Sequence, residues 1–144
     1  MLPESLVFRN VNEYTTAVLY WEFRLLAVNA ILELARLIPL PSELDLPRLH
    51  EMQVELIWRL VSAWQWPQAE GVFVSVHIAI AFVAAWAGLA RKDTLNELSA
   101  AALRRWIYPK LSHPLLKPIT PSTEAGVDSA AYVLLGGPLP MVPS

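Results

Sequence analysis

GVFVSVHIAIAFVAAWAGLA, residues 71–90, is the stretch that decides how this chain folds. It contains no charged side chain, and Arg91, Lys92 and Asp93 follow it directly. An uncharged run of this length could cross a lipid bilayer as a helix. It could equally be the central helix of an all-α core, apolar on every side because other helices surround it. The class of the protein follows from this choice.

The composition of the chain is unusually apolar for a single domain. Of its 144 residues, 55% are hydrophobic and 17% are charged, against typical values of about 45–50% and about 25%. The mean hydropathy is +0.39, so we expect lipid or another protein surface to cover part of the chain. A net charge of −2 gives no general attraction for nucleic-acid phosphates, which argues against direct DNA or RNA binding.

Several kinds of chemistry lack the residues that they need. The chain has no cysteine, which excludes disulfides, thiolate zinc sites, iron–sulfur clusters and cysteine nucleophiles. It also has no HExxH motif, no glycine-rich phosphate loop and no GxSxG motif. The sequence therefore predicts no catalytic, cofactor-binding or metal-binding residue, and a protein that is not an enzyme. The N-terminus does not predict a secretory signal.

The residues before the apolar run predict two further helices. The first covers residues 12–38, begins with Asn12 as its cap and ends before Pro39. It has two apolar stripes and only a narrow polar strip, so we expect other elements to surround most of it. The polar strip consists of Glu22, Asn29, Glu33 and Arg36. The second helix covers residues 48–64 and is amphipathic, with Glu55 and Arg59 spaced for an ion pair on its exposed face.

A fourth helix is expected after the apolar run. Thr94 and Glu97 have the spacing of a capping box, and Pro109 is expected to end the helix. From residue 109 to residue 144 the chain holds seven of its twelve prolines, which predicts an irregular tail. Its one apolar patch, residues 130–135, is predicted to dock back as a short helical turn or a strand. The predicted fold is thus all-α, with about four helices in a domain of residues 1–108 and a Pro-rich tail of residues 109–144.

Three sets of side chains are functional candidates. His77 lies on the apolar run and is either a functional group in a membrane or a neutral core histidine bonded to a backbone carbonyl. Glu22 and Glu33 are three helical turns apart, too far for shared acid–base chemistry, and are predicted to be solvated. The six tryptophans could form a cofactor box or a membrane-interface belt, but their helical spacing favours a core. They are Trp21, Trp58, Trp64, Trp66, Trp86 and Trp106.

The N-terminal half contains a pattern that resembles a known family. Its elements are Ser5-Leu6-x-Phe8-x-Asn10, Ala17, Tyr20-Trp21, Leu25-Leu26, Asn29 and Ile31-Leu32, with Glu70-Gly71 before the apolar run. This pattern resembles the C-terminal part of the helical regulatory region of fungal zinc-cluster transcription factors, and the similarity covers roughly residues 4–106. The zinc cluster itself is absent, because the chain has no cysteine. The resemblance implies a regulatory piece that does not bind DNA in the family's usual way.

The sequence therefore predicts a non-catalytic helical protein that acts through protein–protein contacts in transcription regulation. The resemblance implies a nuclear location and partners that are other protein chains, including a full-length relative or a larger complex. The alternative is a small single-pass accessory subunit of a membrane complex that spans the bilayer at residues 71–90. The two readings differ in what surrounds the apolar run.

Overall fold

The computed structural model describes residues 6–39, 41–64, 66, 72–89, 97–111 and 123–135, with residues 72–77 and 97 described only as parts of their helices. The described residues form five α-helices and no strand, which confirms the all-α class and adds one helix to the four expected. The helices are α1 (Val11–Leu37), α2 (Leu46–Ala63), α4 (Val72–Leu89), α5 (Glu97–Leu111) and α6 (Glu124–Leu134).

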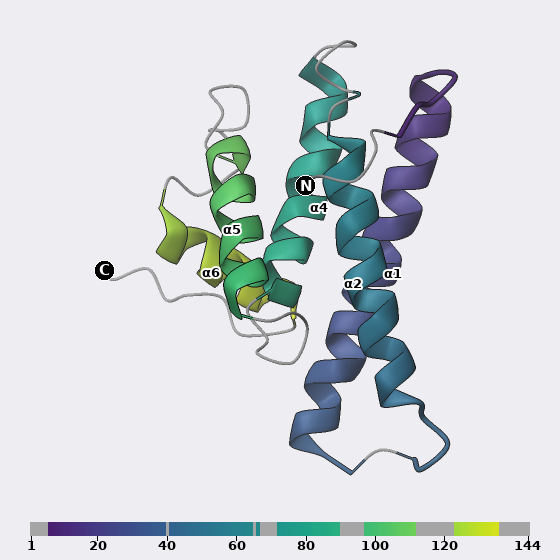
Figure 1. The fold of residues 1–144 in the computed structure, drawn as a ribbon, viewed down its shortest axis with the longest axis vertical. Coiled ribbons are helices and arrows are strands. Elements are labelled where there is room, and N and C mark those ends of the chain that lie inside the picture. Colours follow the sequence, from purple (N-terminus) through teal and green to yellow (C-terminus); the bar gives the residue numbers. More distant parts are fainter. Residues whose placement is uncertain are drawn as a thin grey trace.

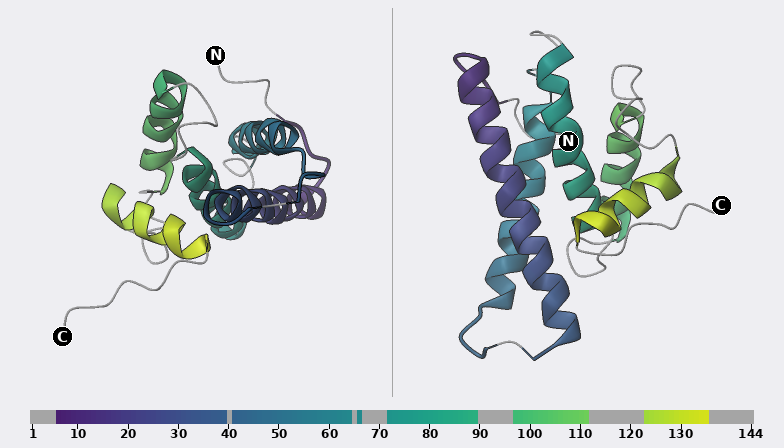
Figure 2. Two further views of the ribbon diagram at one scale, coloured as in Figure 1. Left: turned by 90° about the horizontal axis from the view of Figure 1, so that it is seen from below. Right: turned by 180° about the vertical axis from the view of Figure 1, so that it is seen from behind.

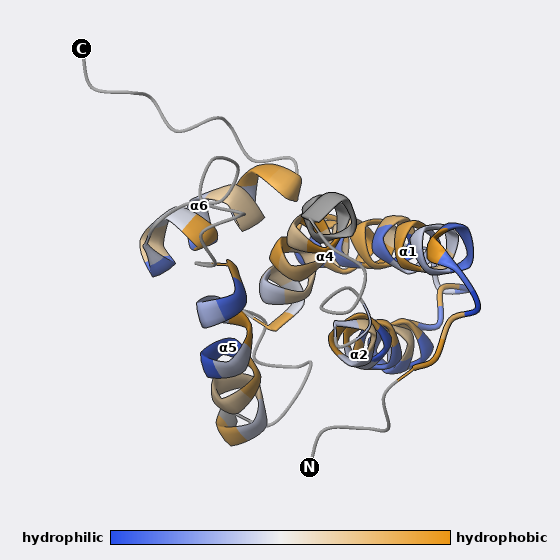
Figure 3. Cartoon of the chain, turned by 90° about the horizontal axis from the view of Figure 1, so that it is seen from above, coloured by the Kyte–Doolittle hydropathy of each residue, from blue (hydrophilic) through white to orange (hydrophobic). Residues whose placement is uncertain are grey.

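The helices are arranged around α4. In Figure 1, α1 and α2 form a long antiparallel hairpin, and α4 runs beside it in the same direction as α1. Figure 2 shows α5 and α6 on the other side of α4 from this hairpin. The packing agrees with these views, since α4 contacts α1, α2, α5 and α6. Figure 3 shows α4 as a largely hydrophobic helix between the two groups.

Capping side chains set where the first two helices begin. Asn10 is the N-cap of α1, because its side chain accepts a 2.9 Å hydrogen bond from the backbone N–H of Glu13, so the predicted cap at Asn12 was wrong by two residues. Asp45 caps α2 in the same way, accepting from the N–H of Arg48 at 2.9 Å. Such a cap satisfies one of the backbone donors that the first turn of a helix leaves free.

The apolar run forms the centre of the bundle. From Ile78 to Leu89 every residue of α4 is buried except Ile80, which is 43% exposed. Other helices surround this part of α4, so the interpretation as a buried core helix is confirmed for these residues. In the part of the chain that the structure describes, no helix is long and apolar enough to cross a membrane.

The C-terminal segment contains more helix than the prolines indicated. Helix α5 continues through Pro109 to Leu111. Helix α6 lies inside the predicted tail, and Thr123 caps it by accepting a 3.1 Å hydrogen bond from the N–H of Gly126. Its buried residues are Val127 and Ala131, which pack towards α4. The irregular structure expected from residue 109 onward therefore does not apply to α6.

The tryptophans are core residues, as their spacing predicted. Trp64 and Trp86 are buried, and the other four are partly buried and pack against the same hydrophobic core. At one end of the bundle, Tyr14 stacks on Trp66 with ring centroids 4.8 Å apart. The indole N–H of Trp66 also donates to the carbonyl oxygen of Phe8 at 3.2 Å, which ties the chain before α1 to the end of α2.

Candidate functional site

Part of the polar strip that the sequence predicts on α1 is buried in the bundle. Glu22 and Asn29 are only 4% and 1% exposed, so the prediction that Glu22 is solvated was wrong. Glu33 has a 30% exposed side chain and forms a 3.5 Å ion pair with Arg36. The inner row of α1, which faces the bundle, is Tyr14, Val18, Trp21, Leu25, Val28 and Leu32. Glu22 and Asn29 lie on the same side of the helix as this row, because they are one or two turns from its members.

Asn29 is satisfied inside the bundle by groups from two other helices. Its Nδ2 donates to the carbonyl oxygen of Ala84 on α4 at 3.0 Å. Its Oδ1 accepts a 2.6 Å hydrogen bond from Nε2 of Gln53 on α2, which is fully buried. A buried amide needs such partners, since desolvation without them is costly. The three-helix contact therefore depends on this polar pair.

Gly88 allows α4 to approach this pair closely. A Cβ atom at Gly88 would lie 3.1 Å from Cδ1 of Ile57, and 3.3 Å from both Oδ1 of Asn29 and Nε2 of Gln53. Such contacts are tighter than ordinary van der Waals packing. A glycine at this position thus fits the short distance between α4 and the α1–α2 hairpin.

Glu22 is the one buried acid on α1. Burial raises the pKa of its carboxyl to about 7, because the charged form is poorly solvated there. Its Oε2 is buried and has no hydrogen-bond partner among the described residues, and the same holds for the hydroxyl of Tyr14. Burial likewise raises the pKa of Tyr14. The two groups lie eight residues apart on one helix, about 12 Å along its axis, so they do not form a catalytic pair.

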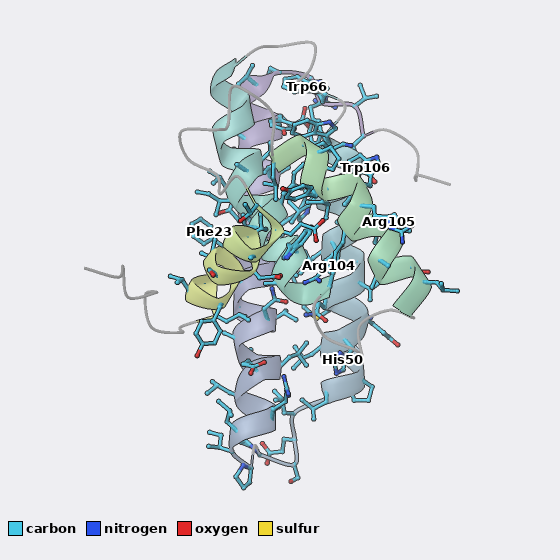
Figure 4. All side chains as sticks on the ribbon, turned by 90° about the vertical axis from the view of Figure 1, so that its left-hand side faces the viewer. Phe23, His50, Trp66, Arg104, Arg105 and Trp106 are labelled. Atoms are coloured by element: carbon cyan, nitrogen blue, oxygen red, sulfur yellow. The ribbon has the colours of Figure 1, made fainter. Side chains whose placement is uncertain are left out.

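The opposite side of α1 carries apolar side chains that are mostly exposed among the described residues. We call this set the outer row: Tyr20, Phe23, Ala27, Ala30, Leu34 and Leu37. Four of its members are large and well exposed, at 55% for Tyr20, 64% for Phe23, 47% for Leu34 and 71% for Leu37. Figure 4 shows Phe23 at the edge of the molecule. The second apolar stripe that the sequence predicts shares Phe23, Ala30, Leu34 and Leu37 with this row, and its other members, Leu19 and Leu26, are half-buried.

A groove lies beside the outer row, where α1 and α2 meet. It encloses about 190 Å³ and is lined by Tyr20, Trp21, Arg24, Met52, Glu55, Leu56 and Arg59. The guanidinium of Arg59 lies 5.6 Å from the ring centroid of Trp21, and that of Arg24 lies 5.4 Å from the ring centroid of Tyr20. Both stackings are at cation–π distance. The walls thus combine flat apolar rings with two cations.

The predicted ion pair on α2 forms one wall of this groove. Arg59 donates to Oε1 of Glu55 from Nη2 at 2.7 Å and from Nε at 3.0 Å. This hydrogen bond and the positive charge of Arg59 hold the pKa of Glu55 below its usual range. The guanidinium of Arg59 is thus paired with Glu55 on its own helix.

A second polar cluster joins α4, α5 and α6. Oδ1 of Asp128 accepts a 2.7 Å hydrogen bond from the indole N–H of Trp86 and a 3.2 Å hydrogen bond from Nη2 of Arg104. The guanidinium of Arg104 also lies 4.5 Å from the ring centroid of Trp86. In Figure 4, Arg104 points from α5 towards the interior of the molecule. These contacts hold α6 against α4 and explain why α6 docks there.

The histidines do not form a site within the described residues. His50 is half-buried on α2, with Nδ1 buried and without a described partner. The side chain of His77 and the whole of His113 lie outside the described residues. The described part of the chain contains no group of three or more His, Cys, Asp or Glu side chains that could hold a metal ion.

The outer row, with the adjoining groove, is the candidate functional surface. The sequence predicts part of this surface, since four of the six members of the outer row belong to the second apolar stripe, but it predicts that other elements cover the stripe. Comparison with protein-family models, curated proteins and solved structures finds no match.

Proposed function

We propose that this protein is a non-catalytic helical regulatory protein that acts through protein–protein contacts in transcription regulation. The observation that carries the proposal is the outer row of α1, with four large apolar side chains 47–71% exposed on one side of a helix. Large exposed apolar patches mark surfaces that bind other proteins. Aromatic side chains such as Tyr20 and Phe23 are enriched at such surfaces.

The polar groups favour a binding role over a chemical one. The buried amides of Asn29 and Gln53 bond to each other and to a backbone carbonyl, and Asp128 is engaged by Trp86 and Arg104. These side chains join helices. An active site instead requires a nucleophile or a general base placed beside a position where substrate could bind.

The regulatory context comes from the resemblance to the C-terminal regulatory region of fungal zinc-cluster transcription factors. Two residues of the resembling pattern, Tyr20 and Trp21, line the groove on α1. A third, Asn29, joins α1 to α2 and α4. We propose on this basis a nuclear protein whose partners are other protein chains and which makes no direct contact with nucleic acid.

A tethering experiment tests this function. The chain is fused to an unrelated DNA-binding domain in a fungal cell, and transcription from a reporter with the matching site is measured. We expect a changed reporter level that is lost when Phe23→Glu and Leu34→Glu are combined. The matched control is Leu98→Glu, which changes a residue that is 85% exposed on α5 and should keep the response. A reporter that the wild-type fusion leaves unchanged, at equal protein level, would contradict the proposal.

A further inference from the structure

The groove between α1 and α2 combines an apolar inner surface with cations at its rim. Trp21 and Met52 line it and are half-buried, and Leu56, which also lines it, is only 5% exposed. Arg24 of α1 and Arg59 of α2 line the same groove and are exposed. A ligand in this groove therefore meets apolar side chains on its inner side and guanidinium groups near the solvent.

The groove carries one more positive charge than negative charge. Its charged residues are Arg24, Arg59 and Glu55. Arg59 donates two hydrogen bonds to Oε1 of Glu55, at 2.7 and 3.0 Å, so the charges of this pair balance. Arg24 instead donates to a neutral acceptor, the hydroxyl of Tyr20, at 2.9 Å. It forms no ion pair with any described residue, and its positive charge is left without a carboxylate.

Arg24 differs in this respect from the other arginines of α1 and α2. Arg36, Arg48 and Arg59 each pair with a glutamate three or four residues away on the same helix. The positions three and four residues from Arg24 hold no acid; they are Tyr20, Trp21, Ala27 and Val28. A guanidinium next to aromatic rings suits a carboxylate that lies beside an apolar group, because it binds the carboxylate through its N–H groups and stacks on rings with its face.

The two helices bring their cations to the same place. The pKa of Glu55 is lowered mainly by its hydrogen bond to Arg59, and the charge of Arg24 on the facing helix adds a smaller effect. Arg24 therefore lies near this carboxylate, since charge interactions at a surface are screened over about 10 Å. A guanidinium has five N–H donors, and the hydroxyl of Tyr20 takes one of those of Arg24. The others can accept a second carboxylate from a ligand.

The volume of the groove limits the size of its occupant. The groove encloses about 190 Å³, whereas pockets for a small molecule have about 300–1,000 Å³. This space suits a single apolar side chain that a longer chain carries. Tyr20 lines the groove and is 55% exposed, and Phe23, one turn further along α1, is 64% exposed. These rings extend the surface beyond the groove, where the rest of a peptide can lie.

We propose that the groove between α1 and α2 binds an acidic peptide segment of a partner protein. An apolar side chain of the segment packs against Trp21 and Met52, and a neighbouring carboxylate binds Arg24. This inference rests on the proposed function and names the chemistry of the partner that the same surface takes.

A peptide titration of the purified full chain tests the groove. The probe is the peptide Gly-Ser-Asp-Phe-Asp-Ser-Gly with blocked termini, and the matched control peptide has asparagine in place of both aspartates. The indole N–H signal of Trp21 in the NMR spectrum reports binding, and the Trp21→Phe protein assigns it. We expect a saturable shift of this signal with the acidic peptide. The asparagine peptide should bind about fivefold more weakly, which corresponds to about 1 kcal/mol, the upper value for an exposed charge pair.

Two arginine variants test whether Arg24 provides the charge. Arg24→Gln should weaken the acidic peptide about fivefold and leave binding of the asparagine peptide unchanged, because it removes the charge and keeps a polar side chain. The control Arg36→Gln removes an exposed cation of the same helix that does not line the groove, and it should bind both peptides as the wild type does. Circular dichroism should show the wild-type helical signal in both variants.

Three results would overturn the proposal. The first is an acidic peptide that shifts the Trp21 signal no more than the asparagine peptide does. The second is equal affinity for the acidic peptide in Arg24→Gln and in the wild type. The third is free phenylacetate that binds at Trp21 as tightly as the acidic peptide, because the occupant would then be a small carboxylate and not a peptide.

The two proposals fail in different ways. A chain that does not bind the acidic peptide, but whose tethered reporter response still depends on Phe23 and Leu34, would remove the acidic partner and keep the interaction function. A chain that binds the acidic peptide through Arg24 and gives no reporter response would keep the groove as a binding site and remove the role in transcription.

Discussion

Nε2 of Gln53 on α2 donates a hydrogen bond to Oδ1 of Asn29 on α1, at 2.6 Å and inside the bundle. The same asparagine donates to the carbonyl oxygen of Ala84 on α4. One buried side chain thus links three helices of the bundle. This arrangement sets which side of α1 faces inward and leaves the outer row at the surface.

Removal of the Asn29 side chain should destabilise the fold. In Asn29→Ala, Gln53 loses one buried hydrogen bond and Ala84 loses the donor to its carbonyl oxygen. Loss of a partner in a buried site typically lowers the free energy of unfolding by about 1–3 kcal/mol. Urea unfolding measures the change. The control is Arg36→Ala. The arginine side chain of this ion pair is 65% exposed, so its removal should lower the free energy of unfolding by less than about 1 kcal/mol. Equal losses in both variants would contradict this account.

Glu22 should make stability depend on pH. Burial raises its pKa to about 7 in the folded chain, against an ordinary value of 4.5. The folded state therefore holds the proton more tightly, and the protein should be most stable below pH 4.5 with respect to this group. Its stability should decline as the pH rises towards 7 and stay lower above it, by up to about 3 kcal/mol at about 1.4 kcal/mol per pKa unit.

Glu22→Gln isolates this contribution. The glutamine variant does not ionise, so it should be more stable than the wild type at pH 8 and nearly equal to it at pH 4. Urea unfolding across this pH range is the measurement. Glu33→Gln, a change on the same helix at a residue paired with Arg36, should leave the slope of the wild type unchanged. A Glu22→Gln protein with the wild-type pH dependence would show that this carboxyl is not the cause.

Asp128 should control the docking of α6. In Asp128→Ala, Trp86 and Arg104 lose their shared acceptor. Hydrogen bonds to charged groups contribute about 1.5–3 kcal/mol, and the 55% exposure of this side chain places the expected loss at the lower end. Hydrogen exchange should rise in α6 more than in α1. Ser129→Ala removes a hydroxyl that bonds within α6 and should leave exchange at the Trp86 contact unchanged.

The two sides of α1 should respond differently to truncation. Leu25→Ala on the inner row, where Leu25 is fully buried, should lower the free energy of unfolding by about 2–5 kcal/mol. Phe23→Ala on the outer row should change the free energy of unfolding by less than about 1 kcal/mol, because Phe23 is 64% exposed and little packing is lost. Similar losses at both positions would mean that the outer row is covered within one chain.

Much of the fold followed from local sequence. The uncharged run predicted a helix that other helices surround, and Ile78–Leu89 lies in that position, with only Ile80 exposed. Helix α2 was predicted from its amphipathic pattern, and the Glu55–Arg59 pair forms as its spacing implied. The six tryptophans were assigned to the core and lie in it or against it. These features depend on hydrophobic period and on contacts four residues apart, which a sequence displays directly.

The errors have a common cause. The predicted cap of α1 was Asn12 and the observed cap is Asn10. Asparagine suits a cap at either position, and only the path of the backbone decides between them. Helix α6 was predicted only as a short helical turn or a strand at residues 130–135 that docks back, because prolines surround it. Its docking depends on Trp86 and Arg104, which precede Asp128 by 42 and 24 residues. Local propensity is weaker than such tertiary contacts.

By itself, the sequence determined that this chain is helical, that its longest apolar run needs covering on every side, and that its chemistry excludes cysteine-dependent sites. Only the tertiary structure decided which side of α1 is buried. Both stripes of α1 are apolar and both fit a helical period, so the sequence does not decide which of them faces the interior. The buried hydrogen bonds of Asn29 to Gln53 and Ala84 decide it, because a polar amide can enter the core only where α2 and α4 supply its partners. The outer row is consequently left at the surface.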